Sequence, residues 1–115
     1  MTLIKLITLI ILFFIFLTGG YIINPDNTTW IIESFSIDFK QHWLTWLFFK
    51  TTPLIQNPIT ANYPYGLALS TTLAVNDSIP LLALFFKYLK PIMNPPNQYL
   101  GIWIFISFVL QGIFA

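Results

Sequence analysis

Residues 3–23 read LIKLITLIILFFIFLTGGYII, an apolar run that is interrupted by one charge, Lys5. A helix of about 20 apolar residues covers the ~30 Å of hydrocarbon in a bilayer. The run therefore predicts a transmembrane helix over residues 1–23. A cleavable signal peptide with Lys5 as its charged region is the competing interpretation. The apolar residues that resume at Tyr21, and the lack of an A-x-A-like cleavage site, favour a retained helix.

A second apolar run, GIWIFISFVLQGIFA, occupies residues 101–115. Together with the four residues before it, this run predicts a second transmembrane helix over residues 97–115. No Lys, Arg, Trp or Tyr follows to anchor its end at a membrane surface, so we expect a truncated helix and a longer parent protein. The lone Lys5 ahead of the first helix predicts a cytoplasmic N-terminus.

The composition favours the same class of protein. Of the 115 residues, 57% are hydrophobic and only 8% are charged, whereas soluble domains contain about 25% charged residues. The net charge of +1 offers no electrostatic basis for binding nucleic acid. Cysteine is absent, which excludes disulfides and thiol chemistry. We therefore expect an all-α membrane protein.

Residues 24–96, between the two runs, are predicted to form an extracytoplasmic loop that carries two amphipathic helices. The first helix spans about residues 37–50, with Ser36 as its N-cap. The second spans about residues 78–90 and is too short to cross a bilayer. Because the first helix is rich in tryptophan, we expect its aromatic residues to lie at a membrane surface.

Polar residues of the first amphipathic helix recur at three- and four-residue spacing, which places Asp38, Gln41, His42 and Thr45 on one face. A carboxylate such as Asp38 is able to act as a general base. His42, four residues later, is positioned to be oriented by it or to share a metal. Asp38 is equally suited to stabilise the helix N-terminus, because the helix dipole favours an anion there.

Three further side chains are candidates for the same chemistry. Asp77 is a possible second acid, although helix capping is its ordinary role at that position. Lys87 and Lys90 are candidates for holding a lipid-linked phosphate, as is Gln41. Both lysines are equally suited to extend their side chains along apolar surface, with the ammonium group at the membrane surface and no ligand bound. The sequence contains no spacing typical of a zinc site.

Two stretches carry a resemblance to a known family. Residues 36–50 (SIDFKQHWLTWLFFK) and 76–87 (NDSIPLLALFFK), followed by QYLG at 98–101 and LQG at 110–112, resemble a group of bacterial multipass membrane proteins. That group is similar to the GT-C type of glycosyltransferases. The resemblance covers nearly the whole chain.

The resemblance implies transfer of a sugar from a polyprenyl-phosphate carrier, outside the cytoplasm and at the bacterial inner (plasma) membrane. It implies Asp38 as the base or metal partner, and Asp77 as the next acid. Many such enzymes have a second acid beside this position, whereas Ile37 and Phe39 flank Asp38 here. No cofactor is therefore predicted, and the question of a bound divalent metal ion is left open.

The implied partners are the lipid bilayer, a polyprenyl-phosphate-linked sugar and the remaining helices of a longer chain. We expect the present chain alone to be inactive. The alternative function is that of a non-catalytic small membrane protein, or a transporter-like fragment, whose loop is anchored at the interface.

Overall fold

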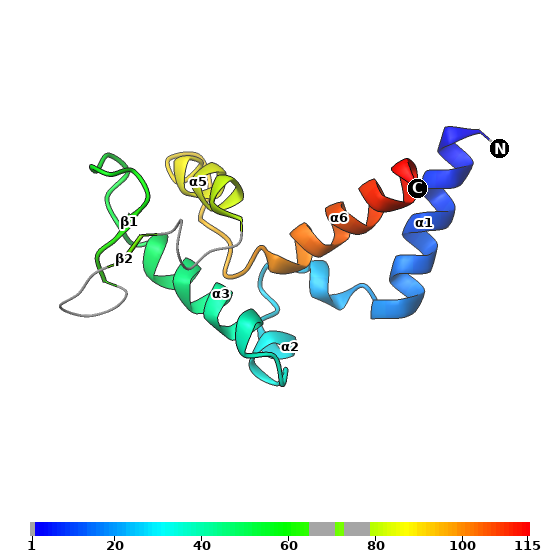
Figure 1. Ribbon diagram of the computed structural model, residues 1–115, viewed down its shortest axis with the longest axis horizontal. Helices are drawn as coiled ribbons and strands as arrows, with labels where there is room; N and C mark the ends of the chain where they lie inside the picture. Colours follow the sequence, from blue (N-terminus) through cyan, green and yellow to red (C-terminus); the bar gives the residue numbers. More distant parts are fainter. Residues whose placement is uncertain (1, 65–70, 73–78) are drawn as a thin grey trace.

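The computed structural model is mostly helical and describes residues 2–64, 71–72 and 79–115 (Figure 1). Its helical elements are α1 (Leu3–Thr18), the 3-10 turn η1 (Tyr21–Ile23), α2 (Thr29–Ile32), α3 (Ile37–Phe49), α5 (Pro80–Tyr88) and α6 (Leu100–Phe114). The strands β1 (Ala61–Asn62) and β2 (Thr71–Thr72) form an antiparallel pair in which Ala61 lies opposite Thr72.

Within the described ranges, no helix is both long and apolar enough to cross a membrane. α1 has 16 residues, which corresponds to about 24 Å against the ~30 Å of a bilayer core. It stops because Gly19 adopts a left-handed φ of 67° and donates its amide to the oxygen of Ile15. Gly20 follows with a φ of 73°. The expected integral membrane protein with two transmembrane helices is therefore wrong, and so is its assignment to the inner membrane.

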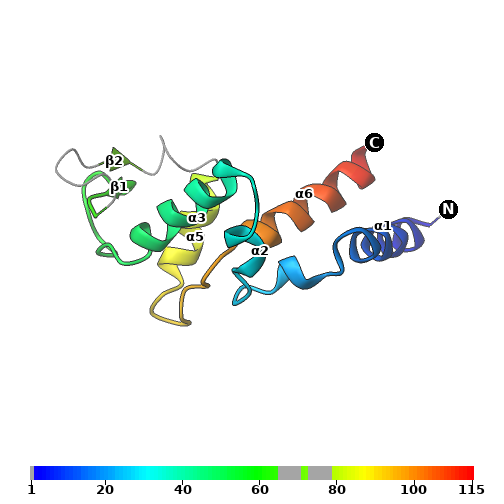
Figure 2. The same ribbon diagram turned by 90° about the horizontal axis from the view of Figure 1, so that it is seen from below.

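α1 and α6 lie side by side at one end of the molecule (Figures 1 and 2). Phe14 is the buried residue of α1, and its ring packs edge-on against Phe105 and Phe108 at centroid distances of 5.1 and 5.3 Å. Gly112 lets α6 come close, since a Cβ there would lie 2.5 Å from Cδ1 of Ile10. Aromatic packing and one small residue therefore hold this helix pair.

The start of α6 is fastened to η1 through Gln98 and Gly101. The buried Gln98 amide donates to the backbone oxygens of Ile22 at 3.0 Å and Asn24 at 2.7 Å. Its Oε1 accepts the amide of Gly101 at 3.0 Å. A Cβ at Gly101 would collide with the backbone oxygen of Ile22, so only glycine permits this approach.

A separate core lies between α3 and α5. It consists of Trp46, Phe49, Ile79, Ala83 and Tyr99. Trp46 is fully buried, and its Nε1 donates to the oxygen of Pro96 at 2.9 Å. The aromatic face of α3 is thus covered by the protein itself, because α5 and the segment before α6 pack on it. The prediction that Trp46 and Phe49 lie at a membrane surface is therefore wrong, because both are buried in this core.

Candidate functional site

The first turn of α3 carries the leading sequence candidate, Asp38. The hydroxyl of Ser36 accepts the amide of Phe39 at 3.3 Å and so begins the helix at Ile37. The Asp38 side chain is exposed and accepts no hydrogen bond from the part of the chain that the structure describes. Asp38 is consequently open to an incoming hydroxyl group.

The other polar residues of α3 divide between solvent and core. Gln41 is exposed, whereas Thr45 is fully buried and His42 is only 6% exposed. The His42 ring packs edge-on against Tyr99 at 5.0 Å. Asp38 and His42 are thus one helical turn apart but lie in different environments, because Tyr99 covers the turn that carries His42. The polar face predicted from the spacing is therefore exposed at Asp38 and Gln41 but buried at His42 and Thr45.

Asp77 lies outside the described residues. Lys90 is exposed beyond the end of α5. Across 2–64, 71–72 and 79–115, no group of three or more His, Cys, Asp or Glu residues is placed to hold a metal ion.

Lys87 is buried, with only 1% of its surface exposed. Its Nζ donates to Oγ1 of Thr52 at 2.7 Å and lies 4.2 Å from the centre of the Phe49 ring. Burial, and secondarily the charge of Lys90, lowers the pKa of Lys87 from 10.5 to about 8. The ammonium group therefore faces the core between α3 and α5 rather than the solvent, where a lipid-linked phosphate would approach.

A polar bridge links the end of α3 to the segments that flank α2 and α6. Lys50 donates to Oδ1 of Asn97, and Asn97 donates to Oδ1 of Asp26, each at 3.2 Å. The indole of Trp43 donates to the backbone oxygen of Asn97 at 3.1 Å. Partial burial lowers the pKa of Lys50. This bridge fixes α3 relative to the helix pair and was not anticipated from the sequence, since its members are far apart in the chain.

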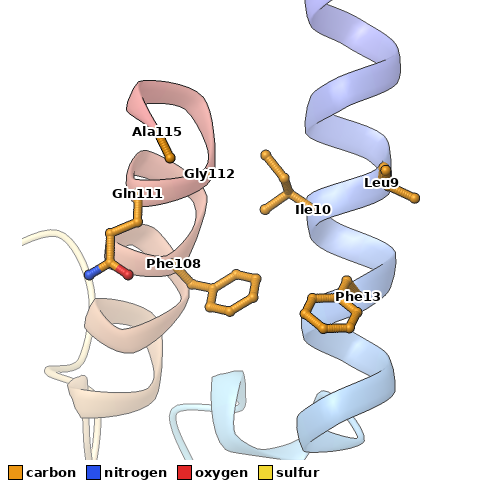
Figure 3. Close-up of a pocket in the computed structure, with 7 residues that line it drawn as sticks. All are labelled: Leu9, Ile10, Phe13, Phe108, Gln111, Gly112 and Ala115. Carbon is orange, nitrogen blue, oxygen red and sulfur yellow. The ribbon is translucent and has the colours of Figure 1, made fainter.

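A groove of about 490 Å³ opens between α1 and α6 (Figure 3). Its lining residues come from the two helices and the final residue: Leu9, Ile10, Phe13, Phe108, Gln111, Gly112 and Ala115. Gln111 is the one polar side chain among them. The Phe108 and Ile10 side chains lie between the two ribbons in Figure 3, and the Phe13 ring lies over the α1 ribbon. The sequence carried no signal for this groove, because about 100 residues separate its two walls.

A second pocket of about 400 Å³ lies between η1 and α2. Its walls are polar and aromatic: Tyr21, Asn27, Thr29, Trp30 and Glu33. None of the sequence candidates lines either this pocket or the groove.

Comparison with protein families matches residues 7–115 to a domain of unknown function, DUF6311. No match is found among curated proteins, and none among solved structures.

Proposed function

Because the chain belongs to the DUF6311 family, whose function is unknown, we propose a function from its own geometry. The protein binds the apolar chain of a lipid-linked sugar in the groove between α1 and α6, and contributes Asp38 to transfer of that sugar. The observation that carries the proposal is the groove and its nearly uniform apolar lining.

The groove suits an isoprenoid or acyl chain for two reasons. Its volume of about 490 Å³ lies within the range of roughly 300–1,000 Å³ that ligand pockets occupy. Its walls offer aliphatic and aromatic carbon with a single amide, so a ligand rich in hydrogen-bonding groups would leave them unpaired there. A hydrocarbon chain needs no such partners, and burying it in the groove removes apolar surface from water on both sides.

The proposed chemistry uses Asp38 as a general base. An acceptor hydroxyl oxygen forms a bond to the anomeric carbon while the bond from that carbon to the lipid phosphate breaks. The electron pair leaves with the phosphate, and the hydroxyl proton passes to the Asp38 carboxylate. The exposure of Asp38 supports this role. The resemblance of residues 36–50 to a group similar to GT-C enzymes also supports it, because that resemblance implies Asp38 as the base.

Binding of a fluorescent isoprenoid phosphate to the full chain tests the groove. Phe13 and Phe16 are both exposed phenylalanines of α1, but only Phe13 lines the groove. Phe13→Gln should weaken binding at least about tenfold, because contact with a phenylalanine side chain is worth roughly 1.5 kcal/mol or more. Phe16→Gln makes the same chemical change outside the groove and should leave binding unchanged.

A second probe, the same fluorophore on a phosphate without the hydrocarbon chain, should not bind. Equal loss in Phe13→Gln and Phe16→Gln, or equal binding of both probes, would contradict the proposal. Circular dichroism of both variants shows whether helix content is retained.

A further inference from the structure

The pocket between η1 and α2 is lined by none of the candidate residues predicted from the sequence. We propose that it binds a neutral pyranose, with the sugar ring against Tyr21 and Trp30 and its hydroxyl groups on Thr29 and Glu33. Binding of free sugar here is independent of the groove, which shares no residue with this pocket. Only its assignment to the sugar of a lipid-linked substrate rests on the proposed function.

The chemistry of the walls matches the two kinds of surface that a pyranose presents. Its ring faces carry C–H groups, which pack on aromatic rings, and its rim carries hydroxyls that each donate and accept. Tyr21 is 56% exposed at the pocket wall and supplies an aromatic surface. The Glu33 carboxylate accepts hydrogen bonds only, whereas the Thr29 hydroxyl donates and accepts.

Trp30 provides the observation that points to a ligand. Its indole Nε1 is buried, and no hydrogen-bond partner for it is found in the described part of the chain. The ring is held edge-on against Phe39 at 5.8 Å, at an angle of 69°. Buried indole N–H groups usually have an acceptor. A sugar hydroxyl oxygen supplies one once the indole turns its N–H toward the pocket, because the N–H is closed to solvent in the unliganded chain.

The local backbone keeps the pocket walls in place without a ligand. Asn27 donates from its side chain to the oxygen of Tyr21 at 3.3 Å and accepts the amide of Thr29 at 3.2 Å. Glu33 caps the C-terminal end of α2 through its backbone amide, which leaves its carboxylate for other contacts. The turn is thus built by Asn27, and its hydrogen bonds use neither the hydroxyl of Thr29 nor the carboxylate of Glu33, two residues that line the pocket.

The indole N–H signal of Trp30 in a proton–nitrogen correlation spectrum reports on this site directly. The Trp30→Phe variant identifies the signal, and methyl glucoside, methyl galactoside and methyl mannoside are the probes. We expect at least one of them to shift the signal saturably, with a dissociation constant in the millimolar range. Glycerol at the same concentrations should not shift it.

Tyr21→Ala should weaken sugar binding at least tenfold. Tyr88→Ala is the matched control, because Tyr88 is a similarly exposed tyrosine on α5 and should leave binding unchanged. Loss of the dispersed indole signals in Tyr21→Ala would mean that this variant has lost its fold. Glu33→Gln then replaces it as the test variant, since Glu33 is exposed and the substitution removes only its charge.

The inference is overturned if none of the three glycosides shifts the Trp30 signal saturably, if glycerol has the same effect, or if Tyr21→Ala and Tyr88→Ala bind alike. Repeating the titration in Phe13→Gln separates the two sites. Sugar binding that persists in that variant supports the pocket even where isoprenoid binding fails.

Discussion

Replacing Lys87 with methionine should make the free energy of unfolding much less dependent on pH in the alkaline range. Lys87 is buried against Thr52 and Phe49, and burial lowers its pKa from 10.5 to about 8. One pKa unit corresponds to about 1.4 kcal/mol, so holding the charged form in the folded chain costs about 3 kcal/mol. Methionine has a similar length and removes this cost together with the hydrogen bond to Thr52.

The direction follows from proton binding. Below about pH 8 both the folded and the unfolded chain carry the Lys87 proton, and the cost is complete. Between about pH 8 and the unfolded value of 10.5, the folded chain has released a proton that the unfolded chain still holds. The free energy of unfolding of the natural chain therefore rises with pH over this window. The Lys87→Met chain lacks this rise.

Urea unfolding at several pH values from 7 to about 10.5 measures the effect. The stability difference between the natural chain and Lys87→Met should change by about 3 kcal/mol across the window. All other ionisable groups are common to both chains, so their contributions cancel in the difference. Lys90→Met is the control, because it removes an exposed lysine from the same region and keeps Lys87. The stability difference between the natural chain and Lys90→Met should change little across the same pH window. A difference that stays constant with pH would refute a buried, desolvated Lys87.

Three further outcomes are expected. Gly101→Ala should lower the free energy of unfolding by about 3 kcal/mol or more, because the new methyl group meets the backbone of Ile22. Gly112→Ala should lower it by less, because the new methyl group there meets the side chain of Ile10, which is able to shift. Thermal unfolding of both variants compares them. Gln98→Leu leaves the oxygens of Ile22 and Asn24 and the amide of Gly101 without their partner, so it should cost at least about 2 kcal/mol and speed hydrogen exchange at Gly101. Asp38→Asn should reduce sugar transfer by about 10²–10⁴-fold with the fold retained. Near-normal transfer by this variant would remove Asp38 from the proposed mechanism.

Local signals in the sequence predicted the positions of the helices in the middle of the chain. Ser36 and Asp38 mark the start of α3, and the observed helix, Ile37–Phe49, ends one residue before the predicted boundary. The second helix was predicted over about residues 78–90, and α5 occupies Pro80–Tyr88 within that range, with proline in the first turn, where it is favoured. Such signals act over one or two turns and therefore survive folding.

One local feature was predicted wrongly. Gly19 and Gly20 lie within the predicted apolar helix, although both adopt left-handed backbone conformations that end α1, as glycine commonly does after a helix. Features that depend on distant contacts were not predictable from the sequence. Lys87 was expected at the surface, but α3 buries it. The pairing of Gln98 with Ile22 links residues 76 positions apart. Periodicity within one segment carries no information about which distant segment covers it.

The bonds from Gln98 and Asn97 to residues near the N-terminus have a consequence for synthesis of the protein on the ribosome. Asp26, Asn24 and Ile22 are translated 71 to 76 residues before their partners. At roughly 5–20 residues per second, that interval lasts about 4–15 s. During it α1 is already made, whereas α6 and the glutamine that fastens η1 do not yet exist. The apolar side of α1 then stays uncovered for millions of times longer than a helix needs to form, so the nascent chain exposes a formed apolar helix until α6 emerges to cover it.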